Sequence, residues 1–205
     1  MQKSTSSKNA QTRKQNESPH ENDSIRSFLN FIELKSFFAG VVFCLVLIFV
    51  LFFSIYSNSF VEAQAVFSPN SQSEVISLIH QAQNSIDLQM YVFTNEQIAV
   101  ELIDATKRGV KVRVILEKRT QSYNLDEIVD ALKQGGVEVC WASEKYKLTH
   151  TKMMIIDDKT VFVGSTNFSK SALLENREAS VILQGNIVKE FIDVFQTDWE
   201  LADKV

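Results

Sequence analysis

The sequence contains only two cysteines in 205 residues, and their positions exclude most structural uses of cysteine. Cys44 lies inside a long apolar segment, so it cannot form a disulfide with Cys140 inside a folded domain. Two thiols are also too few for a cysteine-rich zinc site. The folded part of the chain must therefore be stabilised by an apolar core, and its length is sufficient for one.

Positive charge is scarce in most of the sequence. The net charge is -4, but the first 56 residues hold six of the 21 lysines and arginines and only four of the 25 acidic residues. The remainder therefore carries a net charge of about -6. An acidic domain lacks the broad basic surface of proteins that hold nucleic acid by charge alone, so any phosphate binding has to be local.

One long apolar segment, FFAGVVFCLVLIFVLFFSI from Phe37 to Ile55, contains no charged residue. It is long enough to cross a bilayer, whereas a buried helix of that length would not need to be apolar on every face. The residues before it are polar and typical of a disordered tail. We expect a disordered tail over residues 1–35, a transmembrane helix over residues 36–56 and a folded domain over residues 62–205.

The charges beside the apolar segment predict its orientation. Six lysines and arginines precede it, and the next basic residue after it is Lys107. This asymmetry predicts a cytoplasmic N-terminus and an extracytoplasmic domain. Ala63-Gln-Ala65 resembles the cleavage site of a signal peptide, so a protein secreted after cleavage is the alternative.

Strand and helix patterns alternate from residue 62 onward. The expected strands cover residues 63–67, 86–92, 110–116, 137–142, 152–157, 160–164 and 179–183. Ser71 with Glu74 predicts a capping box at the start of the first helix of the domain. No segment repeats another. The pattern predicts an α/β fold with a mixed β-sheet flanked by helices on both faces.

Residues 150–167, HTKMMIIDDKTVFVGSTN, combine residue types that suit a phosphate group. His150 and Lys152 lie two apart on an expected strand, so their side chains point to the same side. An imidazole can transfer a proton or a phosphoryl group, and an ammonium supplies a fixed charge. The Ser165 hydroxyl and the Asn167 amide can donate hydrogen bonds to further oxygens. Asp157 precedes a turn, where aspartate is also common for structural reasons.

This order of residues resembles the signature of the phospholipase D superfamily, H-x-K-x4-D followed by G-S-x-N. The matching positions are His150, Lys152, Asp157, Gly164, Ser165 and Asn167. The segment Asn176-Arg-Glu178 is similar to the part of that family whose acidic residue hydrogen-bonds the catalytic imidazole. The resemblance implies the phospholipase D/nuclease fold, with Glu178 orienting His150 and Asp157 in a supporting role.

The chain carries one copy of the motif, as do small bacterial endonucleases of this superfamily, whereas full-length phospholipases carry two. The resemblance implies a homodimer in which both His150 side chains meet at one phosphodiester. One imidazole forms a phosphohistidine, while the other protonates the leaving oxygen and then activates water. The resemblance implies neither a metal ion nor a cofactor.

The single motif and the compact domain favour a nonspecific, metal-independent endonuclease that cleaves DNA or RNA. The apolar segment and the acidic balance keep open a phospholipase D that hydrolyses phospholipid head groups at the membrane. A third alternative is an inactive, membrane-tethered dimeric binding protein, against which the complete motif argues. The sequence offers four further candidate phosphate contacts, Lys118, Arg119, Lys145 and Lys147.

Overall fold

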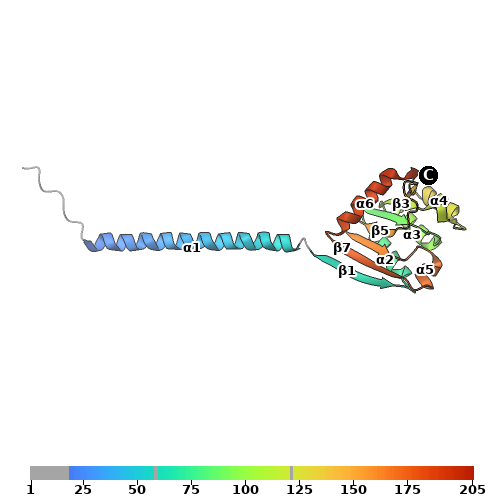
Figure 1. The fold of residues 1–205 in the computed structure, drawn as a ribbon. Helices are drawn as coiled ribbons and strands as arrows, with labels where there is room; N and C mark the ends of the chain where they lie inside the picture. The colour runs from blue at the N-terminus through green and yellow to red at the C-terminus, as the bar shows by residue number, and fades with distance from the viewer. Residues whose placement is uncertain (1–18, 58–59, 121) are drawn as a thin grey trace, which may run out of the picture. The chain divides into compact units, whose positions relative to one another are not determined.

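The computed structural model describes residues 19–57, 60–120 and 122–205, which belong to two units (Figure 1). The first unit, which ends at Ile55, contains all but the last two residues of helix α1 (Pro19–Ser57), and the second, from Tyr56 onward, contains an α/β domain. Residues 19–35, expected in the disordered tail, are helical. Residues 1–18, the rest of that expected tail, lie outside the described residues.

Helix α1 has the length and composition of a membrane span over Arg26–Ser54. None of the residues in the most apolar part of that stretch is buried inside the protein. A signal sequence shares these properties, so length and composition do not separate an anchor from a cleaved leader.

In the described residues the strands form one mixed sheet in the order β1-β7-β6-β5-β2-β3-β4-β8. The strands are β1 (Val61–Phe67), β2 (Ser85–Met90), β3 (Lys111–Leu116), β4 (Glu138–Trp141), β5 (Lys152–Ile156), β6 (Thr160–Gly164), β7 (Ala179–Gly185) and β8 (Asp203–Lys204). Strands β2, β3 and β4 are parallel, and the other neighbouring strands are antiparallel. The predicted mixed sheet is confirmed, and the short β8 was not predicted.

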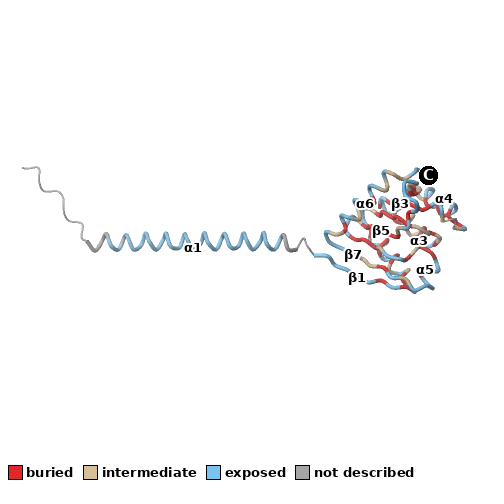
Figure 2. Tube along the Cα trace, in the orientation of Figure 1, coloured by how far each residue is buried: buried red, intermediate tan, exposed pale blue. Residues whose placement is uncertain are grey.

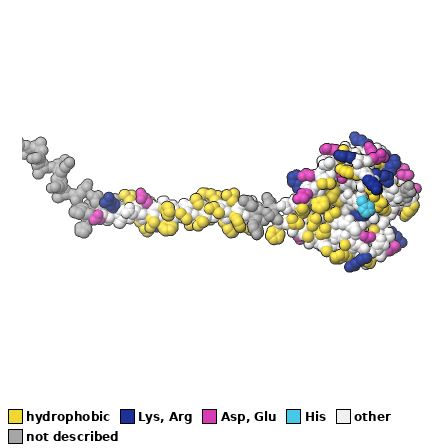
Figure 3. Space-filling view, in the orientation of Figure 1, with side chains coloured by type: hydrophobic (Ala, Val, Ile, Leu, Met, Phe, Trp, Pro, Cys, Tyr) yellow, Lys and Arg dark blue, Asp and Glu magenta, His cyan; other side chains and the backbone are white. Residues whose placement is uncertain are grey.

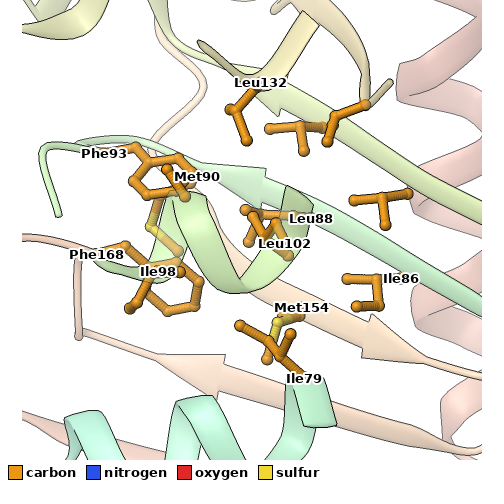
Figure 4. Packing of buried hydrophobic residues seen from close by; sticks show 14 of the residues in the cluster. Ile79, Ile86, Leu88, Met90, Phe93, Ile98, Leu102, Leu132, Met154 and Phe168 are labelled. Atoms are coloured by element: carbon orange, nitrogen blue, oxygen red, sulfur yellow. The ribbon is translucent and has the colours of Figure 1, made fainter. Parts of the chain in front are cut away.

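Helices cover both faces of this sheet, as predicted. They are α2 (Gln72–Gln81), α3 (Glu96–Lys107), α4 (Leu125–Gln134), α5 (Lys170–Leu174) and α6 (Val188–Leu201), and a short 3-10 helix, η1, covers Lys118–Thr120. The larger core packs α2, α3 and α4 against the strands, with Leu88, Leu102 and Met154 at its centre (Figure 4). A second core lies under α6, where Phe195 packs near Ile155. Burial therefore follows the central strands (Figure 2).

The ends of α2 and α3 show where local sequence signals succeed and fail. Asn95 caps α3, because its side chain accepts the Ile98 N–H at 3.0 Å. The capping box predicted from Ser71 and Glu74 is wrong. Ser71 has a helical backbone (φ -81°, ψ -2°) and its side chain makes no capping hydrogen bond; its hydroxyl donates to the Leu173 carbonyl at 3.5 Å.

The β5–β6 hairpin turns through residues 157–159, where the sequence predicts a hairpin turn. Asp157 and Asp158 have φ values of +52° and +56°, and the Lys159 N–H donates to the Ile156 carbonyl at 3.0 Å. Two successive left-handed residues define a type I′ turn, which matches the twist of the paired strands and favours Asp, Asn or Gly. The aspartates therefore suit the turn through their backbone.

One end of the sheet collects the chain segments that carry the predicted site. Strands β2, β3, β4 and β6 end there, and β5 and β7 begin there, as the pairing of Met90 with Lys152 and of Gly164 with Ser180 shows. We call this the site end. Open α/β sheets bind ligands at the carboxyl ends of their parallel strands, and the site end contains those of β2, β3 and β4.

Candidate active site

His150 and Lys152 lie together at the site end. His150 is exposed, whereas Lys152, the first residue of β5, is 6% exposed. The Lys152 Nζ donates to the His150 carbonyl at 2.9 Å and lies 3.3 Å from both nitrogens of the imidazole. The Tyr91 ring lies 4.3 Å from the His150 ring and 4.8 Å from the Lys152 Nζ, measured to ring centroids. The structure thus holds the imidazole beside a fixed cation.

The Lys152 ammonium occupies an environment with little compensating charge. Burial lowers the pKa of Lys152, and the negative charge of Glu178 opposes that shift only in part. Among the described residues, no carboxylate forms an ion pair with the Lys152 Nζ. A buried cation without an ionic partner is stabilised by an arriving anion, and a phosphodiester oxygen supplies that charge.

Ser165 and Glu178 join the end of β6 to the start of β7. The Ser165 hydroxyl donates to Glu178 Oε2 at 2.5 Å and accepts the Ala179 N–H at 3.1 Å. Glu178 Oε1 accepts from the Asn176 amide at 3.3 Å. Within the described chain Glu178 makes no hydrogen bond with His150, so the orienting role expected from the sequence stays a prediction.

Asn167 is held against the segment that follows β2. Its Oδ1 accepts the Val92 N–H at 3.2 Å, and the neighbouring Phe168 N–H donates to the Val92 carbonyl at 3.1 Å. The Asn167 Nδ2 makes no hydrogen bond to any described residue and is left as a donor. Asn167 can therefore serve as the neutral donor that the sequence predicts.

Gly164 is required by a close approach between strands. A Cβ atom there would lie 2.3 Å from the Ser180 hydroxyl oxygen and 2.5 Å from the Ala179 carbonyl oxygen. Its role is thus to let β6 and β7 pack at the site end, directly before Ser165.

Asp157 is the one predicted site residue that the structure does not bring to the others. It lies beyond the far end of β5, a strand length of about 17 Å from Lys152. Its carboxylate accepts the N–H groups of Gln83, Asn84 and Ser85 at 2.6 to 3.2 Å. Burial raises its pKa, but these hydrogen bonds outweigh burial, and the pKa is lowered overall. Asp157 fastens the hairpin to the loop before β2.

An ion pair between a buried carboxylate and a partly exposed arginine beside the site was missed by sequence reasoning. Glu117 directly follows β3 and is 1% exposed. Its two oxygens accept the Arg119 Nε and Nη2 at 2.6 Å each, and Oε2 also accepts the Thr149 N–H at 2.9 Å. Thr149 immediately precedes His150. The only sequence signal for this pair was a glutamate at the end of an apolar strand.

Arg119 forms hydrogen bonds within the protein, whereas the sequence suggested that it contacts phosphate. Its Nη1 donates to the carbonyls of Tyr146 and Lys147 at 3.0 and 2.8 Å. Hydrogen bonds to Glu117 raise the Arg119 pKa. Burial raises the pKa of Glu117. The hydrogen bonds from Arg119 and from the Thr149 N–H together lower it by more than burial raises it, so its pKa is lowered overall. We call Glu117 and Arg119 the clamp, because together they hold the loop that leads into His150.

The architecture is that of the phospholipase D-like class of α/β domains. The chain belongs to the family described as cardiolipin synthase, PLD-like domain, whose sequence profile matches residues 75–199, more than half of the chain. The recognition made from the motif is therefore confirmed.

Two solved structures share this fold. Nuc from Salmonella typhimurium, a phospholipase D family member, is 27% identical with a TM-score of 0.67, covering 71% of this chain and 99% of Nuc. NucT from Helicobacter pylori is 26% identical with a TM-score of 0.64, covering 71% of this chain and all of NucT.

Curated relatives include a mitochondrial cardiolipin hydrolase of Mus musculus, 30% identical over 139 residues, or 66% of this chain and 61% of that protein. A phospholipase D of Rickettsia prowazekii is 31% identical over 116 residues, or 57% of this chain and 56% of that protein. The chain thus spans about three fifths of the length of these relatives.

Proposed function

We propose that this chain is a metal-independent phosphodiester hydrolase in which His150 is the nucleophile. The observation that carries the proposal is the buried Lys152 ammonium, which forms no ion pair with a carboxylate of the described residues and lies 3.3 Å from the nitrogens of the exposed His150 imidazole. A phosphodiester suits this arrangement, because the imidazole can attack its electrophilic phosphorus and the ammonium can bind its anionic oxygens. The Asn167 Nδ2, which makes no hydrogen bond to a described residue, is a further donor for those oxygens.

The reaction needs two acid–base groups, and one chain supplies one of them. A His150 ring nitrogen attacks phosphorus and forms an N–P bond while the P–O bond to the leaving group breaks. The leaving oxygen takes a proton from the His150 of a second copy. That second imidazole then removes a proton from water, which attacks phosphorus and releases His150. We therefore propose a homodimeric site.

A partly exposed apolar face supports the dimer. Phe67 is 54% exposed, and on the same face Val163, Val181 and Leu183 are only partly covered, in register across β1, β7 and β6. Figure 3 shows apolar side chains gathered over this part of the domain. Phe67 lies at the site end, opposite Ala179. A second copy on this face would bring its own site end alongside the first.

A matched pair of variants tests the dimer. Phe67→Ser should yield a monomer with little activity in sedimentation and hydrolysis assays. Val100→Ser is the control, because Val100 is equally exposed at 53% but lies on α3, on the opposite face. Full activity in a Phe67→Ser monomer would contradict a shared site.

Nucleic acid is the substrate that we propose, with the chain acting as a nonspecific endonuclease on DNA or RNA. The structural similarity to Nuc and NucT over nearly their whole length supports this choice.

A phospholipase D acting on head groups is the second candidate. Two observations favour it: the apolar helix α1 and the names of the curated relatives, cardiolipin hydrolase and phospholipase D. We propose in either case that α1 is a membrane anchor, with the N-terminus cytoplasmic and the domain over residues 62–205 outside. Protease treatment of intact cells should degrade an outside domain, and a protected domain would refute this orientation.

An activity panel separates the candidates. Detergent-solubilised full-length chain in EDTA should cleave DNA or RNA oligonucleotides, and mass spectrometry should detect phosphate on His150. Hydrolysis of cardiolipin or phosphatidylcholine without nucleic acid cleavage would favour the second candidate. His150→Ala should be inactive, whereas His80→Ala, a change on the surface of α2, should not. An equally active His150→Ala protein would refute the proposed mechanism.

A further inference from the structure

The loop directly before His150 presents basic, aromatic and apolar side chains to solvent. We call residues 143–149, which lie between β4 and His150, the rim loop. Lys145, Tyr146, Lys147 and Leu148 are all exposed, Tyr146 and Leu148 by 41% each. On the face in view in Figure 3, basic side chains gather beside a histidine.

The rim loop and the neighbouring Lys118 carry a local positive charge although the domain is acidic. Lys118 is exposed and lies on η1, directly before Arg119, which donates hydrogen bonds to the rim loop. In the clamp, the charges of Glu117 and Arg119 compensate each other. Three lysines then face a single remaining acidic residue, Glu144, within residues 117–120 and 143–149. None of these three lysines forms an ion pair with a described residue.

The clamp fixes the backbone from which these side chains project. Arg119 binds two successive carbonyls of the rim loop, and Glu117 binds the N–H of its last residue, Thr149. The Ser143 hydroxyl accepts the Lys145 N–H at 3.2 Å near the other end of the loop. A loop held at several points loses little conformational entropy when it binds, so the rim loop is preorganised for a ligand.

We propose that the rim loop and Lys118 bind the strand of a single-stranded nucleic acid that flanks the phosphodiester at His150. Lys118, Lys145 and Lys147 neutralise phosphates, and the Tyr146 ring stacks on an unpaired base. This subsite rests on the proposed nuclease function and deepens it.

The arrangement favours a nucleic acid strand over a lipid. A strand carries further phosphates on both sides of the one being cleaved, which gives several separate lysines a ligand. It also carries flat bases, and a partly exposed tyrosine is a platform for stacking on any of them. Bases in a duplex are already paired and stacked, so stacking on Tyr146 selects single strands.

The test measures oligonucleotide cleavage by full-length chain at several salt concentrations. Lys145→Ala/Lys147→Ala should raise KM about tenfold at low salt. It should also reduce the slope of log(kcat/KM) against log salt by about 1.4, because each lost contact to a single strand removes about 0.7. Tyr146→Leu should raise KM about fivefold, and Tyr146→Phe, which keeps the ring, should restore it.

The matched control is Lys107→Ala/Lys133→Ala, which removes the same charge from the last turns of α3 and α4, before strands that begin at the opposite end of the sheet. All variants should hydrolyse bis(p-nitrophenyl) phosphate normally, because this small diester needs only the site around His150. That activity also shows that each variant is folded.

Three results would overturn the proposal, each in a distinguishable way. Rim variants with the KM and salt slope of the control would refute the subsite while leaving the nuclease proposal intact. Loss of cardiolipin hydrolysis in mixed micelles, with unchanged oligonucleotide KM, would assign the rim to a lipid surface. A wild-type chain that hydrolyses bis(p-nitrophenyl) phosphate but no nucleic acid would refute the nuclease proposal and the rim subsite with it.

Discussion

Replacing Glu117 by glutamine perturbs the clamp without changing the size of the side chain. The carboxylate accepts hydrogen bonds from Arg119 Nε, Arg119 Nη2, the Arg119 N–H and the Thr149 N–H. Glutamine removes the charge and turns one acceptor into an NH2 donor. At least one buried N–H then faces another donor, and Arg119 loses its ionic partner but keeps the carbonyls of Tyr146 and Lys147.

The structure sets the expected size of the effect. Breaking a fully buried ion pair costs about 3–5 kcal/mol, but the Arg119 side chain is 36% exposed and can be rehydrated. The lost hydrogen bonds to a charged group add to the cost. We expect Glu117→Gln to lower the free energy of unfolding by about 2–3 kcal/mol. For a domain of this size, that corresponds to a melting temperature lower by about 4–12 °C.

The same change should lower activity through the position of His150. Thr149 carries the hydrogen bond to Glu117 and is covalently next to His150. We expect kcat for bis(p-nitrophenyl) phosphate to fall about tenfold with little change in KM, because the clamp does not touch this substrate. A loss confined to stability, with normal kcat at a temperature where the variant is folded, would show that the clamp does not position His150.

The pH dependence gives an independent check with a defined sign. The pKa of Glu117 is lowered in the folded state, so its contribution to stability is present above its unfolded value near 4.5 and is lost as pH falls through the folded pKa. The stability gap between wild type and Glu117→Gln should be full at pH 7, shrink as the pH falls below the unfolded pKa of Glu117, and close below its lower folded pKa. A gap that is constant with pH would refute the electrostatic explanation.

Glu138→Gln is the matched control for this experiment. Glu138 forms an exposed ion pair with Lys111 at 3.6 Å, and both side chains are more than half exposed. Such pairs contribute about 0–1 kcal/mol. Equal melting temperatures for Glu117→Gln and Glu138→Gln would contradict the reasoning.

Two further predictions concern the ends of β5. Asp157→Asn, which keeps an acceptor and tolerates the positive φ, should lower the free energy of unfolding by about 1–2 kcal/mol in thermal melts and leave kcat within about twofold; a hundredfold loss of kcat would show a catalytic role. Lys152→Met should abolish hydrolysis yet raise the free energy of unfolding by about 1 kcal/mol, because it removes a buried charge; a destabilised variant would mean that the ammonium has a stronger partner than the described contacts.

The sequence predicted the sheet, and it placed four candidate site residues near one another, because both depend on short-range patterns. His150 and Lys152 begin one strand of a hairpin, and Ser165 and Asn167 follow its other strand. The short turn fixes the register of this hairpin, so the spacing along the chain determines which side chains meet. Glu178 also comes to the site end, through the pairing of β6 with β7.

The clamp and the hydrogen-bond partners of Asp157 could not be predicted, because both depend on contacts between distant segments. Arg119 reaches carbonyls about 27 residues away, and Asp157 reaches backbone N–H groups about 73 residues away. An arginine beside a lysine is also typical of a solvated surface, and an aspartate is typical of a turn. Only the packing of loops at each end of the sheet distinguishes these roles.

The two ends of β5 influence stability in opposite directions. At neutral pH the ionised Asp157 stabilises the fold, since three N–H groups lower its pKa, whereas the buried Lys152 ammonium destabilises it. The strand can therefore hold a cation ready for a phosphate at one end because its other end is fastened. Among the contacts of the described residues, the two side chains share no partner, and they lie about 17 Å apart. We expect the effects of Asp157→Asn and Lys152→Met to add within about 0.5 kcal/mol in a double variant. A larger deviation would show that the hairpin transmits strain between its ends.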